Sequence, residues 1–297
     1  MEAPEVDEQD GREPGRFYRP GTAAPAVFRL EWRPPMPGRP ARERSPRYRI
    51  MEQIEYVDDL RRWHRFPLDV DHNETDLASI PFFVTWLVPK DGAHTPAALL
   101  HDTLIGGTVG VDYDTSDGEQ ISERHADYLF REAMRNSSVG VVRRWLMWSA
   151  VSMKTLCVRR GGGSFWKKAR WGRILPISAA FIVALALAFV MALDVPDFIN
   201  SEKTFDDKAL LSWLSWFDVF GERPWWSEIL RGVGAIAVCA ALCAVVVALV
   251  TRSTQGLWAG GVVGVAIGFL GLPAVASLVG FSIYWAFEQA ARWIGRS

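Results

Sequence analysis

The sequence predicts an α+β soluble domain followed by an all-α transmembrane module. Three observations predict this combination. Short runs of alternating β-forming residues precede helical patterns between residues 47 and 158. Long apolar runs fill much of residues 174–297, and a basic, glycine-containing hinge at 159–173 joins the two parts. We therefore expect a short strand pair plus three or four helices, and then about three transmembrane helices.

The N-terminal segment, residues 1–46, differs in composition from the rest of the chain. It holds nine of the seventeen prolines, together with many arginine, glutamate and glycine residues. Such a composition buries too little apolar surface to offset the conformational entropy of the chain, so we predict a disordered, Pro-rich tail. Only its end, near residues 28–32, is expected to add a strand.

The soluble domain, residues 47–158, begins with two predicted strands, 47–57 and 62–70, which alternate β-forming residues and are expected to pair. Residues 73–89 follow, and their Asn, Thr, Asp and Pro content predicts a loop that turns into a short helix.

Three longer helices are predicted after this loop. The first begins at Thr95, with Pro96 at its first turn, and ends at the glycines that follow. Ser122 is a suitable N-cap for the second helix, which runs to about Met134. The third covers about residues 139–158.

The membrane module, residues 174–297, contains three apolar runs, at 174–193, 232–250 and 257–287. Each is long enough to cross a hydrocarbon core of about 30 Å at 1.5 Å per residue. The third run is overlong, so we expect it to tilt, to kink at residues 271–273, or to end along the interface.

The charges beside the first run predict the orientation. Residues 154–173 contain seven Lys or Arg and no acidic residue, whereas the loop 194–231 is acidic on balance. The positive-inside rule therefore places the N-terminal domain in the cytoplasm and the loop outside, with four tryptophans as interfacial anchors: Trp213, Trp216, Trp225 and Trp226.

Small residues recur along the apolar runs. Gly260, Gly264 and Gly268 form one stripe, which allows two helix backbones to approach closely. Two partners fit this stripe: another helix of the same chain, or a second copy in a homo-oligomer. No ionisable residue lies within a span, which argues against a proton- or ion-coupled transporter.

Two helices of the soluble domain carry unusual polar residues. His101 and Asp102 end an apolar helix, and Asp127 borders the apolar stripe of the next one. A buried carboxylate needs a partner, and a histidine on a packed neighbouring helix is suitable. Such a pair orients the imidazole, stabilises its protonated form and leaves the other ring nitrogen free to take a proton from water. Asp102 would then be free to ligate a hard cation such as Ca²⁺. The alternative is that these residues only cap and bridge core helices.

Three motifs in order carry a family resemblance: "TDLASIP", "LLHD" and "ADYLF". Over about residues 47–155 the chain resembles a phage-associated bacterial family, the domain of unknown function numbered 1353. This family has no established activity.

A looser resemblance implies chemistry. The "HD" helix followed by "RHADYLFREAM" is similar to bacterial phospholipase A2 enzymes. It implies a phospholipase-A2-like helix pair in which His101 is the general base, Asp127 orients it, and Asp102 with Asp76 ligates Ca²⁺. The disulfides and the usual calcium loop of those enzymes are not matched; a reducing cytoplasm would not keep the former.

Other binding classes are weakly indicated. In the loop 112–123 four oxygen-bearing residues follow EF-hand spacing, but the turn glycine is one position late, which favours a polar surface loop. The remaining histidines are too scattered for a zinc site. The net charge of −1 does not indicate nucleic-acid binding.

The sequence thus supports two hypotheses for a multi-pass protein of the bacterial inner membrane. One is a calcium-assisted phospholipid hydrolase acting at the membrane. The other is a non-enzymatic membrane protein whose soluble domain binds a partner while the spans oligomerise.

Overall fold

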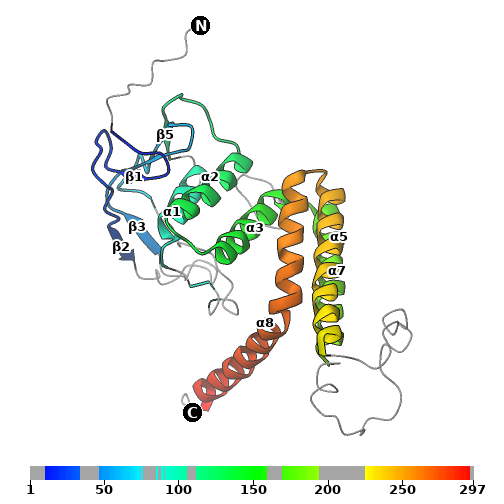
Figure 1. The fold of residues 1–297 in the computed structure, drawn as a ribbon. Coiled ribbons are helices and arrows are strands. Elements are labelled where there is room, and N and C mark those ends of the chain that lie inside the picture. Colours follow the sequence, from blue (N-terminus) through cyan, green and yellow to red (C-terminus); the bar gives the residue numbers. More distant parts are fainter. Residues whose placement is uncertain are drawn as a thin grey trace, which may run out of the picture. The chain divides into compact units, whose positions relative to one another are not determined.

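A computed structural model describes residues 11–33, 47–73, 75, 85, 88–89, 91–105, 112–158, 169–193 and 225–294. The chain divides into two compact units, Met1–Trp148 and Ser149–Ser297. The first unit is α+β and the second is all-α, as the sequence predicts (Figure 1).

The main sheet of the first unit has the strand order β1-β4-β5-β6, with every neighbouring pair antiparallel. The strands are β1 Phe17–Tyr18, β4 Ile54–Val57, β5 Trp63–Phe66 and β6 Asp114–Thr115. All four residues of β4 are buried, because strands flank it on both sides. The predicted pairing of two strands in this region is confirmed by the β4–β5 ladder.

A second, two-stranded sheet pairs β2 Leu30–Arg33 with β3 Arg47–Ile50. The predicted strand 47–57 is therefore wrong in extent, since it is divided between two sheets. Asn73 accounts for the break: its side-chain oxygen accepts from Ile50 N at 2.7 Å, and its amide donates to Ile50 O at 3.0 Å. The Asn73 side chain thus bonds the backbone groups of Ile50 that a neighbouring strand would otherwise bond.

Residues 11–33 contribute strands to both sheets, β1 to the main sheet and β2 to the second, and this differs from the disordered tail predicted for residues 1–46. The buried carboxylate of Glu55 accepts from Arg12 at 2.6 Å, from Gly21 N at 3.1 Å and from Arg65. A buried charge is retained only when it is paired and hydrogen-bonded, so this contact fixes the segment despite its unfavourable composition. The predicted strand near residues 28–32 is confirmed as β2.

In the described residues between the sheets and the first apolar helix, three helices are present: α1 Thr95–Leu104, α2 Glu123–Asn136 and α3 Val141–Cys157. Pro96 lies in the first turn of α1. Ser122 caps α2, because its hydroxyl accepts from His125 N at 3.2 Å. The predicted short helix within residues 73–89 lies almost entirely outside the described residues.

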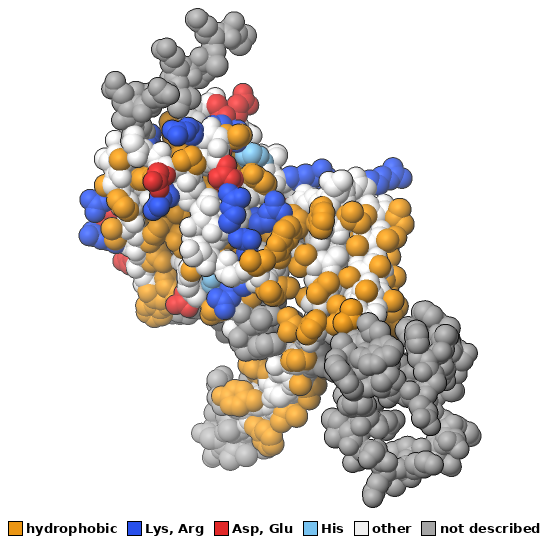
Figure 2. Space-filling model, in the orientation of Figure 1, with side chains coloured by type: hydrophobic (Ala, Val, Ile, Leu, Met, Phe, Trp, Pro, Cys, Tyr) orange, Lys and Arg blue, Asp and Glu red, His pale blue; other side chains and the backbone are white. Residues whose placement is uncertain are grey.

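Within its described residues, the second unit contains three helices that are long and apolar enough to cross a membrane: α5 Trp171–Leu193, α7 Trp225–Thr251 and α8 Thr254–Ile294. Their most apolar windows are 171–189, 232–251 and 254–271, with mean hydropathies of 2.0, 2.9 and 1.3. Figure 2 shows hydrophobic side chains covering the outside of these helices, as expected for contact with lipid.

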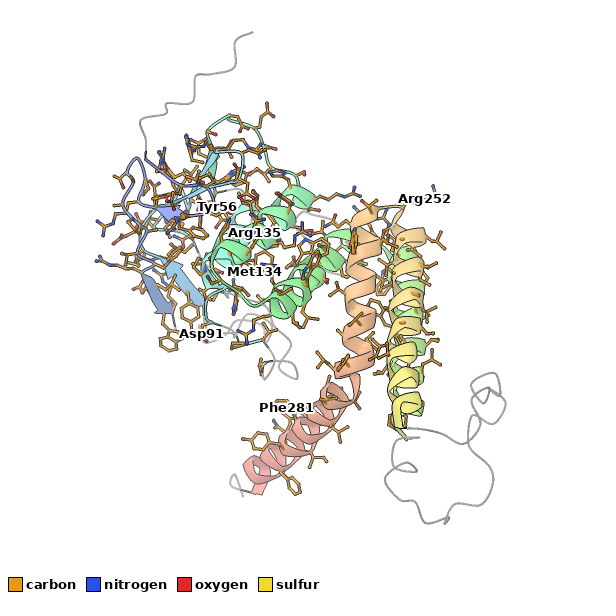
Figure 3. The ribbon with its side chains drawn as sticks, viewed as in Figure 1. Tyr56, Asp91, Met134, Arg135, Arg252 and Phe281 are labelled. Atoms are coloured by element: carbon orange, nitrogen blue, oxygen red, sulfur yellow. The ribbon has the colours of Figure 1, made fainter. Side chains whose placement is uncertain are left out.

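Helix α8 bends between its orange and red parts in Figure 1. Pro273 lies inside this helix, where proline lacks a donor and clashes with the carbonyl four residues earlier. The bend agrees with the kink predicted at residues 271–273. After the bend, the side chain of Phe281 is exposed, as expected for a helix that contacts lipid (Figure 3).

The glycine stripe of α8 packs against α7. An added Cβ on Gly260 would lie 2.6 Å from Cys243 O, and one on Gly264 would meet the backbone of Cys239 and Ala240. The stripe therefore serves helix packing within the chain, and a homo-oligomer through the same glycines stays a prediction. Trp213 and Trp216, two of the predicted anchors, lie outside the described residues, and of Trp225 and Trp226 only the helical backbone is described.

Candidate functional site

Helices α1 and α2 pack against each other and bring two of the predicted site residues together. On α1, Ala97, Leu100, His101 and Leu104 recur at helical spacing and are buried. On α2, Asp127 and Phe130 belong to the buried face. The same apolar periodicity that packs the helices thus directs one imidazole and one carboxylate into their interface.

His101 and Asp127 form a direct polar contact. His101 Nε2 lies 2.9 Å from Asp127 Oδ1, and the residues are 5% and 0% exposed. The imidazole also packs on Phe130, with ring centroids 5.1 Å apart. With the proton of a neutral ring on Nε2, this nitrogen donates to the carboxylate and Nδ1 keeps a free lone pair. No hydrogen-bond partner of Nδ1 is found within the described ranges.

Asp102 faces a different neighbour, because adjacent helical residues point about 100° apart. Its Oδ2 accepts a hydrogen bond of 2.8 Å from the hydroxyl of Thr75. The backbone of Thr75 pairs in turn with Tyr48 of β3, through hydrogen bonds of 2.8 and 2.9 Å. Asp102 thus links the last turn of α1 to the segment beside the second sheet.

The described residues do not complete a calcium site. Ca²⁺ takes six to eight oxygen ligands. Among these residues no group of three or more His, Cys, Asp or Glu side chains is arranged to hold a metal ion. Asp76, the second predicted ligand, lies outside the described residues, so the calcium prediction stays a prediction.

The motif-bearing part of the chain also matches a known family. Residues 48–151 match the family described as Protein of unknown function (DUF1353). The predicted resemblance to this family is confirmed for this segment, which contains α1, α2, His101 and Asp127, while the similarity to phospholipase A2 stays a prediction. No curated protein and no solved structure matches the chain.

In the loop 112–123 of the DUF1353 segment, aspartate carboxylates accept hydrogen bonds from protein groups. Asp112 Oδ1 accepts from the backbone of Leu68 and Asp69 at 2.9 and 2.8 Å. Asp117 Oδ1 accepts from the hydroxyl of Thr115 at 2.8 Å. These contacts are those of a polar surface loop.

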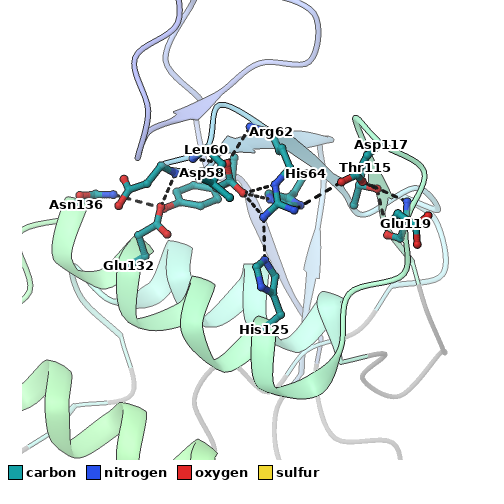
Figure 4. A network of polar contacts seen from close by, with 12 residues as sticks. Asp58, Leu60, Arg62, His64, Thr115, Asp117, Glu119, His125, Glu132 and Asn136 are labelled. Atoms are coloured by element: carbon teal, nitrogen blue, oxygen red, sulfur yellow. Dashed lines mark hydrogen bonds and ion pairs between the residues drawn. The ribbon is translucent and has the colours of Figure 1, made fainter. Parts of the chain in front are cut away.

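A second polar cluster in the DUF1353 segment was not predicted from the sequence (Figure 4). Asp58 Oδ2 lies 2.9 Å from Arg62 Nε and 3.3 Å from His64 Nε2, and a further nitrogen of Arg62 lies 3.1 Å from His125 Nε2. The sequence did offer one signal for this cluster: Asp58, Arg62 and His64 lie close together around the turn between two predicted strands. His125 comes from α2 and could be placed there only by the fold.

Charge within this cluster favours a structural role over metal binding. Burial raises the pKa of Asp58, but hydrogen bonds from His64 and Arg62 outweigh this effect, so the pKa lies below its usual value. Burial and the positive charge of Arg62 lower the pKa of His125. The guanidinium of Arg62 lies between the carboxylate of Asp58 and the imidazole of His125. It therefore occupies the position where a metal cation would bind.

Beside this cluster lies a carboxylate with an unusual environment. Glu132 Oε1 accepts from the hydroxyl of Tyr56 and from Asp59 N, both at 2.9 Å. Its Oε2 is buried and has no hydrogen-bond partner among the described residues. Burial is the largest cause that raises the pKa of Glu132 to about 7, and the negative charges of Asp59 and Asp58 add to it. Burial and Glu132 raise the pKa of Tyr56 as well.

Proposed function

We propose that this protein is a membrane-anchored hydrolase that cleaves phospholipid esters at the membrane surface. The observation that carries the proposal is the contact of 2.9 Å between His101 Nε2 and Asp127 Oδ1. This pair has the components of a general base: an imidazole, a buried carboxylate that orients it, and a second ring nitrogen available for a proton.

The proposed reaction follows from this arrangement. His101 Nδ1 takes a proton from a water molecule while the water oxygen bonds to the ester carbonyl carbon. Asp127 stabilises the imidazolium that forms, since an opposite charge at hydrogen-bond distance favours the charged ring. The imidazolium then gives its proton to the leaving alcohol oxygen as the carbon–oxygen bond breaks. The products are a fatty acid and a lysophospholipid.

Calcium is part of the proposal as a cofactor. When bound, it would polarise the ester carbonyl and hold the lipid phosphate. Asp102 and Asp76 would contribute ligands to it, as the similarity to bacterial phospholipase A2 implies.

The setting of the site supports a lipid substrate. Three apolar helices in the same chain have the length and composition to cross a membrane. We propose the bacterial inner membrane, with the DUF1353 segment on the cytoplasmic side, because Lys and Arg are enriched just before the first span. A tethered domain meets its membrane at a high effective concentration, which favours a substrate embedded in that membrane.

The test uses the full chain reconstituted with labelled phospholipids, in calcium and in a calcium chelator. Release of labelled fatty acid is expected in calcium only, and it is expected to fall to background in His101→Ala and strongly in Asp102→Asn. His72→Ala is the matched control, because His72 is an exposed histidine whose ring forms a hydrogen bond only with Asp69 among the described residues.

If a folded sample releases no fatty acid from any lipid class, the hydrolase proposal fails. The His101–Asp127 pair is then a structural bridge between α1 and α2. The alternative function, a non-enzymatic membrane protein whose soluble domain binds a partner, becomes the better account.

A further inference from the structure

Five arginines lie on the surface formed by α2 and the first half of α3: Arg124, Arg131, Arg135, Arg143 and Arg144. Between residues 123 and 148, Glu123 is the one acidic residue that is not buried. In Figure 2, Lys and Arg side chains gather beside hydrophobic ones over these two helices. This surface, defined by α2 and residues 141–148, is called the α2–α3 face below.

Most of the positive charge on the α2–α3 face has no acidic partner among the residues that the structure describes. Arg135 pairs with Asp59 at 2.6 Å. Arg131, Arg143 and Arg144 form no salt bridge with any described residue. Burial is the largest cause that lowers the pKa of Arg131, and the positive charges of Arg144 and Arg135 add to it, so both lie close enough to Arg131 to repel it. Such a cluster gains free energy from an external anion.

Aromatic rings surround the central cation of this face. The guanidinium of Arg131 lies 4.8 Å from the ring centre of Trp145, 5.0 Å from that of Trp148 and 5.7 Å from that of Tyr128. Tyr128 is 44% exposed and Trp145 is half-buried, so these two rings reach the surface, whereas Trp148 is buried. Tryptophan and tyrosine favour the headgroup region of a bilayer, where one part of the ring is in apolar surroundings and the other is hydrated.

Exposed aliphatic side chains extend the same face. Val141 and Val142, at the start of α3, are 60% and 68% exposed. Val141 lies on the helical stripe of Arg144, Trp145 and Trp148, at i, i+3, i+4 and i+7. Cations, interfacial aromatic rings and an exposed apolar edge on one surface are the components of an interfacial membrane contact.

We propose that the α2–α3 face docks on the anionic lipid headgroups of the membrane that the chain's own helices cross. Charge complementarity selects an anionic partner, and the aromatic and aliphatic side chains select a bilayer surface. Residues 149–170 join this face to the first apolar helix, α5, so the chain keeps it within reach of that bilayer. The inference stands independently of the hydrolase proposal, since it requires no chemistry at His101.

The experiment places an environment-sensitive fluorescent amino acid at Val141 of the full chain, in nanodiscs that hold one chain each. Discs of phosphatidylcholine are compared with discs that also contain phosphatidylglycerol, and both include headgroup-quenching lipids. Quenching and a blue shift are expected in the phosphatidylglycerol discs and are expected to disappear at high salt.

The double variant R131Q/R144Q is expected to lower the ratio of docked to free face about thirtyfold, because each cation near an anionic surface contributes a factor of about five. The control R19Q/R61Q removes the same charge from exposed residues that form no salt bridge among the described residues, and it is expected to leave the quenching unchanged. Because Arg131 also stacks on three rings, R144Q alone and the salt titration of the unchanged chain test the same point without removing that stack.

Three outcomes would overturn the proposal. Equal quenching in both disc types would show that the negative charge of the lipid is not sensed. An equal loss in R131Q/R144Q and R19Q/R61Q would show that the charge acts globally. A blue shift that is absent from these one-chain discs and appears only in a second set of discs that hold two chains would assign the α2–α3 face to a second copy.

Discussion

At the scale of single residues, the account depends on two buried acids with different partners. Asp127 is fully buried and contacts His101 at 2.9 Å. Glu132, five residues further along α2, has a tyrosine hydroxyl and a backbone N–H as partners of one oxygen. Asp127 therefore has a partner that can take up a proton, whereas the hydrogen-bond donors to Glu132 are neutral groups.

The contact between Asp127 and His101 predicts that two substitutions of Asp127 lower the unfolding free energy by different amounts. Asp127→Ala leaves the buried ring N–H of His101 without this acceptor, which costs about 1–3 kcal/mol of unfolding free energy. Asp127→Asn keeps an acceptor oxygen, so its loss should be smaller. Thermal unfolding of the full chain in detergent, followed by circular dichroism, measures both.

Glu119→Ala is the control for this series, because Glu119 is an exposed acid whose side chain forms no hydrogen bond or salt bridge among the described residues. An Asp127→Ala variant as stable as Glu119→Ala would show that His101 does not depend on Asp127.

Glu132 predicts a dependence of stability on pH. Its folded pKa of about 7 lies above its ordinary value of 4.5, so the folded state binds more protons than the unfolded state between these two values. The unfolding free energy contributed by Glu132 therefore falls as pH rises from about 4.5 to 7. The hydrogen bond from Tyr56 lowers the pKa of Glu132 and so reduces this fall, but burial outweighs it.

Glu132→Gln should remove this contribution. The variant should gain stability over the parent chain as pH rises from 5 to 8, by on the order of 1–3 kcal/mol. Parallel denaturation curves across this range measure the difference. A difference that is constant with pH would mean that the carboxylate titrates normally.

At the scale of elements, the predictable features are those with local causes. Pro96 and Ser122 indicated the starts of α1 and α2, and uninterrupted apolar runs indicated the three spans. The features that were missed depend on contacts distant in sequence. Asn73 ends β3 by bonding Ile50, and neither residue signals this in its local sequence.

The candidate site follows the same rule. The pairing of His101 with Asp127 could be expected because helical periodicity directed both residues toward a shared core. The cluster around Asp58 could not, because it needs His125 from a helix that the sequence does not place beside β5. The folding of residues 11–33 was missed for a similar reason, since Arg12 meets Glu55 only in the assembled sheet.

The close contact between α7 and α8 predicts that one added methyl group on a glycine of α8 destabilises the protein. Gly264→Ala would place a Cβ against the backbone around Cys239, which cannot move as a flexible side chain can. It should lower the thermal stability of the full chain in detergent. Gly280→Ala is the matched control in the same helix, because nothing lies within 4 Å of its Cβ position. Equal midpoints for the two variants would contradict close packing of these helices.

At the scale of the whole molecule, a DUF1353 segment and three apolar helices share one chain. Because both parts belong to one chain, the proposed reaction would take place at the surface of the membrane that the helices cross. A histidine base held by a buried carboxylate could serve many hydrolyses, but a tether to the bilayer favours a lipid ester. The α2–α3 face, if it docks as proposed, would keep the same segment at the headgroups.

The initial rate of fatty-acid release from phospholipid vesicles containing the full chain tests the central claim most directly. The parent chain should release fatty acid, His101→Gln should release none above background, and Asp127→Asn should be slower by about 10²- to 10⁴-fold, because the imidazole loses the carboxylate that orients it and stabilises its charge. A parent chain that is folded and yet no faster than His101→Gln on any lipid class would contradict the account.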